Sequence, residues 1–227
     1  MSGPVTPTPL LLGHRGAKLY APENTFAAFD LALTHGCDGF EFDVRRTVDG
    51  QAVVVHDQEV SGLQVAKSTL LELREASHQP LPTLEEVWRR YHAHAFLDVE
   101  LKVSGLAQDV ARLWRELPPN RGGLVSSFIP EVLEEVQVIA PGIPLGYICR
   151  DPQLLDQWRK LPINYAVLQS ELLNDSLMNE LHDAGKALIV WTLNDDASLQ
   201  RFQAEKVAAL ISDDTRLMAQ VIRPRAL

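Results

Sequence analysis

Residues 39–57 read GFEFDVRRTVDGQAVVVHD, and this stretch decides how many parallel strands the chain is expected to form. Its first part, 39–44, is an apolar run with Glu41 and Asp43 set two residues apart, which places both carboxylates on one face of a strand. The Asp49-Gly50 pair is a strong hairpin signal, so the following run, 52–56, should return antiparallel to it. We therefore expect 52–56 to form a short β-hairpin excursion after the second strand and not a further parallel strand.

With that run set aside, eight short apolar runs remain, and each is joined to the next by a connection that contains at least one predicted helix. Runs of this kind are typical of strands buried on both faces. The predicted strands are 10–14, 39–44, 96–102, 124–128, 145–149, 166–169, 187–192 and 208–212. The predicted helices are 25–34, 84–91, 106–116, 130–139, 152–161, 175–184, 197–205 and 215–222.

Eight parallel strands alternating with helices in 227 residues indicate an α/β chain that forms a single (β/α)8 TIM barrel. We expect residues 1–227 to form one catalytic domain, with 57–80 as a short insertion near its site. The alternative is an open, doubly wound sheet. That fold favours a G-x-G-x-x-G turn after the first strand, and residues 13–16 read GHRG instead.

The composition is that of an ordinary globular protein, with 46% hydrophobic residues and a net charge of −9. An acidic chain repels nucleic acid and anionic lipid at long range, so we expect no nucleic-acid partner and no stable membrane insertion. Two cysteines make no disulfide framework. No signal segment is visible, which predicts a cytoplasmic protein. The oligomeric state stays open.

Charged residues stand at the carboxyl ends of the predicted strands, where TIM barrels carry their catalytic groups. Glu41 and Asp43 end the second strand, and Glu100 ends the third, with Lys102 on the same face. Three carboxylates at one mouth repel each other, and a divalent cation with oxygen ligands, Mg2+ or Ca2+, compensates them. In the alternative interpretation, these carboxylates form ion pairs with nearby basic residues and only close the top of the barrel.

Two histidines, His14 and His56, also fall at predicted strand ends. Beside a metal ion they are typical of a general acid and a general base. Arg15 and Lys102 supply the local positive charge that recognises a phosphate. Together these groups suit cleavage of a phosphoester, with attack by water or by a hydroxyl of the substrate, since no residue stands out as a covalent nucleophile.

The motifs resemble those of the glycerophosphodiester phosphodiesterases in order along nearly the whole chain. The matching segments are GHRGA at 13–17, APENT at 21–25, EFDV at 41–44, TVDG at 47–50, VVVHD at 53–57, LPTLEE at 81–86, ELK at 100–102, SF at 127–128, WTLN at 191–194 and ISD at 211–213. The chain departs from the pattern in the short 58–79 segment, which leaves the alcohol specificity open, and in Asp213-Asp214-Thr215, where many relatives carry Asp-x-Pro.

The resemblance implies a TIM-barrel enzyme that splits a glycerophosphodiester into glycerol 3-phosphate and an alcohol. It implies that one divalent cation, Mg2+ or Ca2+, binds to the carboxylates at 41, 43 and 100. His14 and His56 would be the acid–base pair, Arg15 and Lys102 would bind the phosphate, and Trp191 would form an apolar wall beside the glycerol. Two alternatives stay open, a phospholipase C- or D-like enzyme that acts on lysolipids and a non-catalytic barrel that binds phosphoglycerol compounds.

Overall fold

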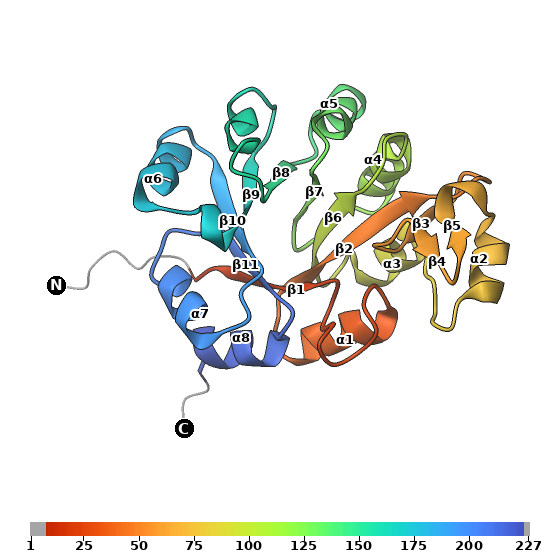
Figure 1. The fold of residues 1–227 in the computed structure, drawn as a ribbon, viewed down its shortest axis with the longest axis horizontal. Helices are drawn as coiled ribbons and strands as arrows, with labels where there is room; N and C mark the ends of the chain where they lie inside the picture. The colour runs from red at the N-terminus through yellow and green to blue at the C-terminus, as the bar shows by residue number, and fades with distance from the viewer. Residues whose placement is uncertain (1–7, 225–227) are drawn as a thin grey trace.

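The computed structural model describes residues 8–224, and its main sheet closes into a barrel of eight parallel strands. The strands follow the order β1-β11-β10-β9-β8-β7-β6-β2, and β2 pairs back with β1 (Figure 1). The predicted (β/α)8 barrel is therefore confirmed. The barrel strands are β1 (Leu10–His14), β2 (Gly39–Arg46), β6 (Phe96–Leu101), β7 (Gly123–Ser127), β8 (Leu145–Cys149), β9 (Tyr165–Gln169), β10 (Ala187–Trp191) and β11 (Ala209–Ser212).

Helices surround the barrel, and most begin at a residue that caps them through its side chain. Thr83, for example, forms a complete capping box with Glu86. Between residues 8 and 224, no helix has both the length and the apolar composition needed to cross a membrane. The α-helices are α1 (Phe26–Thr34), α2 (Leu70–Ala76), α3 (Leu84–Tyr91), α4 (Ala107–Glu116), α5 (Pro130–Ile139), α6 (Asp175–Asp183), α7 (Asp196–Gln203) and α8 (Thr215–Ile222).

The helix predicted over 152–161 is wrong. The chain there forms turns and a short 3-10 helix, η2 (Leu155–Arg159). Within η2 only Trp158 is buried, and Leu154 just before it is exposed. A single buried side chain does not give the continuous apolar stripe with which an α-helix of this length packs on the core. Another 3-10 helix, η3 (Ser170–Leu172), follows β9.

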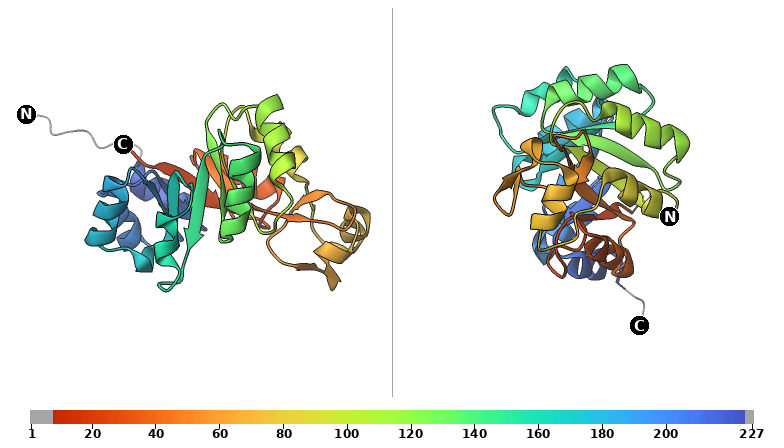
Figure 2. Two further views of the ribbon diagram at one scale, coloured as in Figure 1. Left: turned by 90° about the horizontal axis from the view of Figure 1, so that it is seen from above. Right: turned by 90° about the vertical axis from the view of Figure 1, so that its right-hand side faces the viewer.

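The predicted hairpin is present: β3 (Ala52–Val54) pairs antiparallel with the end of β2. Beyond it the chain forms a small unit at the side of the barrel, which projects from the main body in Figure 2. A small apolar cluster that includes Val53, Val65 and Leu73 stabilises this unit. The sequence prediction missed its elements, which are β4 (Glu59–Val60), β5 (Leu63–Gln64), η1 (Val65–Lys67) and α2.

The barrel interior is apolar toward the amino ends of the strands and polar toward their carboxyl ends. Leu12, Phe96 and Ile189 belong to one buried cluster contributed by the barrel strands. Side chains on a strand share a face every second residue, so His14 follows Leu12, and Asp98 and Glu100 follow Phe96. The strand alternation thus places the polar side chains next to this apolar cluster, at the carboxyl ends of the strands.

Candidate active site

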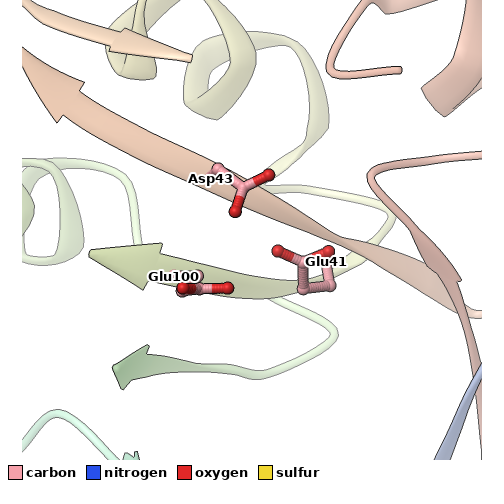
Figure 3. A group of neighbouring side chains, drawn as sticks. All are labelled: Glu41, Asp43 and Glu100. Carbon is pink, nitrogen blue, oxygen red and sulfur yellow. The ribbon is translucent and has the colours of Figure 1, made fainter. Parts of the chain in front are cut away.

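Three buried carboxylates meet at the carboxyl ends of β2 and β6 (Figure 3). Oxygen atoms of Glu41, Asp43 and Glu100 lie within 4.8 Å of one another. Glu41 Oε1 and Asp43 Oδ1 are buried and lack a hydrogen-bond partner among the described residues. Because a buried carboxylate oxygen is costly to leave without a hydrogen bond, two such atoms beside a third carboxylate indicate a cation-binding site. Oxygen donors of this kind fit Mg2+ or Ca2+.

The protonation tendencies of the three carboxylates differ. Burial raises the pKa of Glu41 well above its usual range, and the charge of Asp43 adds to the effect. Burial likewise raises the pKa of Glu100 to about 7. Burial also favours protonated Asp43, but Lys102 and Arg15 outweigh it and hold the pKa of Asp43 below its usual value. Without a cation, the cluster resists carrying its full negative charge.

Two basic side chains enter the same cluster. Arg15 Nε lies 3.2 Å from Asp43 Oδ2, and Lys102 Nζ lies 3.3 Å from Asp43 Oδ1 and 2.5 Å from Glu100 Oε1. These contacts correspond to the ion pairs of the alternative interpretation. The three acids outnumber the two bases, however, and the two carboxylate oxygens described above stay without a hydrogen bond.

The loop after β1 holds Arg15 and Asp43 in place. Arg15 has a left-handed backbone, with φ at 54°, and its N–H donates to Glu41 Oε2 at 3.0 Å. Its guanidinium also donates to Glu23. Asn24 donates to Asp43 Oδ2 and accepts from the Asp43 N–H, while Thr25, and not Asn24, caps α1. Asn24 therefore orients a carboxylate of the cluster.

His14 is almost enclosed at the end of β1. Its Nδ1 lies 2.6 Å from Asp213 Oδ1, and its Nε2 lies 3.9 Å from Glu41 Oε2. Asp213 also accepts a hydrogen bond from Asn194 and forms an ion pair with Lys18. Burial favours protonated Asp213, but the hydrogen bond with His14 and these contacts outweigh it and lower the pKa of Asp213 to about 2. Burial lowers the pKa of His14. A neutral His14 that donates Nδ1–H to Asp213 leaves Nε2 as the free acceptor.

His56 lies just beyond β3 and is more open, with 33% of its side chain exposed. Its Nδ1 lies 2.8 Å from Asp57 Oδ1, and its carbonyl accepts a 2.7 Å hydrogen bond from Arg45 Nε. Arg45 comes from the end of β2, so the hydrogen bond ties the excursion to the barrel. His56 Nε2 has no hydrogen-bond partner among residues 8–224 and can act toward a bound molecule.

One pocket of about 250 Å³ joins these groups at the mouth of the barrel. Its polar side chains include both histidines, Arg15 and Lys102 and two of the three clustered carboxylates, while its apolar side chains include Phe128 and Trp191. The indole N–H of Trp191 donates to the Val167 carbonyl, and its ring meets Phe128 edge-on at 5.7 Å. The predicted residues that line the pocket are His14, Arg15, Glu41, His56, Glu100, Lys102 and Trp191, and Asp43 lies directly behind them in the carboxylate cluster.

Three residues with close contacts in the site, Asp213, Glu23 and Asn24, were not among the predicted site residues. Asp213 follows the eighth strand, so the strand-end rule that selected His14 also selects it. Asn24 and Glu23 lie in a loop with no strand periodicity. Only the folded loop brings Asn24 to Asp43 and Glu23 to Arg15, which is why their contacts were not evident from the sequence.

The chain matches the glycerophosphoryl diester phosphodiesterase family over residues 14–217. A curated relative, YhdW of Bacillus subtilis, is 31% identical, and the match covers 89% of this chain and 93% of that protein. The crystal structure of a glycerophosphodiester phosphodiesterase from Agrobacterium tumefaciens has a TM-score of 0.82 at 26% identity, covering 94% of this chain and all of that one.

A second solved structure, a phosphodiesterase from Oleispira antarctica, is described in complex with the product sn-glycerol-3-phosphate. Its TM-score is 0.81 at 24% identity, and the match covers 95% of this chain and 97% of that one. At this identity, the likeness supports the shared fold.

Proposed function

Because this chain belongs to the glycerophosphoryl diester phosphodiesterase family, we propose that it hydrolyses glycerophosphodiesters to glycerol 3-phosphate and an alcohol. One observation supports this activity above the others. His14, His56, Arg15 and Lys102 line one pocket beside a cluster of buried carboxylates. Phosphodiester cleavage needs proton transfer, a phosphate site and compensation of developing charge, and these groups offer all three in one place.

The proposed metal ligands are Glu41, Asp43 and Glu100. Their closely spaced oxygens, two of which accept no hydrogen bond from the described residues, support one divalent cation, Mg2+ or Ca2+. When bound, such an ion would stabilise negative charge that develops on the phosphoryl oxygens. Asn24 would keep Asp43 oriented toward the ion through their two hydrogen bonds.

Arg15 and Lys102 are the proposed phosphate-binding residues. Both line the pocket, and both are held by carboxylates that limit their freedom before substrate arrives. Ordering these long side chains in advance lowers the entropic cost of binding. Trp191 is proposed as the apolar wall beside the glycerol moiety, and its indole hydrogen bond fixes the ring in that position.

The histidines are proposed to transfer protons in two steps. In the first step, the glycerol 2-hydroxyl attacks phosphorus, one histidine takes its proton, and the other protonates the departing alcohol oxygen. In the second step, water opens the cyclic phosphate and the two histidines exchange roles, which restores their initial protonation. His14 and His56 each have Nδ1 held by an aspartate, so each presents Nε2 for these transfers.

Glycerophosphocholine and glycerophosphoethanolamine are suitable first substrates for testing this proposal. The proposal predicts release of free glycerol 3-phosphate, quantified enzymatically, together with choline or ethanolamine. A lysolipid tested in parallel distinguishes the phospholipase alternative. Binding of the diesters without any turnover would contradict the enzyme assignment and support a non-catalytic barrel instead.

A further inference from the structure

Arg150 is a cation at the pocket mouth that the proposed reaction does not use. It directly follows β8, at the carboxyl end of the strand, and its side chain lines the pocket. Its guanidinium carbon lies 5.8 Å from the centroid of the Phe128 ring. Among residues 8–224 no carboxylate lies within ion-pair distance of it, and the residue is exposed.

This arrangement differs from that of the two inner cations. Arg15 and Lys102 are each paired with carboxylates of the buried cluster. Arg150 is not neutralised in this way, and its contact with Phe128 restrains the side chain without using its N–H donors. The pocket therefore keeps one set of guanidinium donors available at its outer end.

Phe128 is the aromatic residue that Arg150 shares with an inner cation of the pocket. Lys102 Nζ lies 5.6 Å from the centroid of this ring, so the ring interacts with a cation from the inner site as well as with Arg150. Trp191 also packs edge-on against the Phe128 ring. A third positive group, such as a quaternary ammonium, would meet two cations at the aromatic surface that would otherwise attract it.

We propose that Arg150 is a specificity-determining residue that selects a glycerophosphodiester whose alcohol carries its own phosphate group. This inference rests on the proposed function. With the scissile phosphate at Arg15 and Lys102, the alcohol extends past Phe128 toward the mouth, where Arg150 binds its phosphate. Arginine suits this role because its planar donors pair with two phosphate oxygens at once.

The test compares substrates that differ by one phosphate. Values of kcat/KM are measured for glycerophosphoinositol 4-phosphate, glycerophosphoinositol and glycerophosphocholine with wild-type protein, Arg150→Gln and Arg150→Glu. The wild type should prefer the phosphorylated substrate over glycerophosphoinositol by about tenfold, through one charge-assisted contact. Arg150→Gln should bring this ratio close to one, and Arg150→Glu should invert it. Arg121→Gln is the matched control, because Arg121 is an exposed arginine just before β7, at the opposite end of the barrel.

The outcomes separate the two proposals. Turnover of glycerophosphoinositol with a ratio near one in the wild type overturns the role of Arg150 and leaves the proposed function standing. A preference that survives Arg150→Gln, or an equal loss on both inositol substrates, overturns it as well. Absence of glycerol 3-phosphate release from all three diesters contradicts the proposed function, and the role of Arg150 then fails with it.

Discussion

His14 and His56 face one pocket from supports of different kinds. His14 ends β1, which is bonded to a barrel strand on each side, and Asp213 holds its ring. His56 follows β3, in the excursion, and Arg45 connects its carbonyl to the barrel. The exposed fractions of the two side chains are 14% and 33%. The closed barrel fixes one histidine through its whole framework, whereas a few local contacts position the other.

The largest expected effect is on kcat and tests the acid–base role proposed for both histidines. His14→Ala and His56→Ala should each lower kcat by about 10²- to 10⁴-fold, the usual contribution of a positioned acid or base. Glycerol 3-phosphate release is the measurement. His182→Ala, at an exposed histidine of α6, is the control and should keep wild-type activity. Full activity in both site variants would contradict the acid–base proposal.

The next effect concerns the support of His14. Asp213→Ala should lower kcat by about 10- to 100-fold while KM changes little, because the ring loses the acceptor that keeps Nε2 toward the pocket. Asp213→Asn retains an acceptor oxygen and should lose less activity. A rise in KM of the same size in both variants, with kcat unchanged, would indicate that Asp213 acts in substrate binding instead. The ¹⁵N spectrum of His14 checks the tautomer directly, because Nδ1 should carry the proton.

Stability should distinguish the two histidines more clearly than activity does. His14→Ala leaves Asp213 without its shortest hydrogen bond and should lower the free energy of unfolding by about 1–2 kcal/mol. His56→Ala removes a partly exposed ring and should change it by less than about 0.5 kcal/mol. Urea unfolding of the two variants measures the difference. Equal losses would show that the excursion is as tightly coupled to the fold as the barrel strand.

The pH dependence of stability sharpens the same contrast. The pKa of Asp213 is lowered to about 2 in the folded protein, so its carboxylate stabilises the fold above the unfolded pKa near 4. Asp213→Asn should therefore cost about 1 kcal/mol near pH 7, and the difference from wild type should shrink as the pH falls from 4 toward 2. Urea unfolding at several pH values tests this. A constant difference across that range would contradict the ionic role of Asp213.

Strand periodicity made much of this architecture predictable. Alternation along 39–44 and 96–102 placed Glu41, Asp43 and Glu100 on the inner face, and the structure brings these three together. The Asp49-Gly50 signal identified the hairpin because the turn depends on local residues, and Gly50 adopts a left-handed backbone there with φ at 80°. These features depend on neighbours in sequence, so they can be read from it.

Contacts between distant segments could not be predicted in the same way. Asp213 reaches His14 across 199 positions, and Asn24 reaches Asp43 from an irregular loop. The helix predicted over 152–161 failed for a related reason, since burial of Trp158 by the rest of the fold favours a tighter local turn there. Such details are set by tertiary packing.

The metal requirement is tested most directly by depleting the protein with a chelator and returning one ion at a time. Glycerol 3-phosphate release and calorimetric binding are followed together for wild type and Asp43→Asn. We predict that chelation abolishes turnover, that Mg2+ or Ca2+ restores it in step with binding of one ion, and that Asp43→Asn loses both responses. Undiminished turnover in chelator would contradict the proposed metal site.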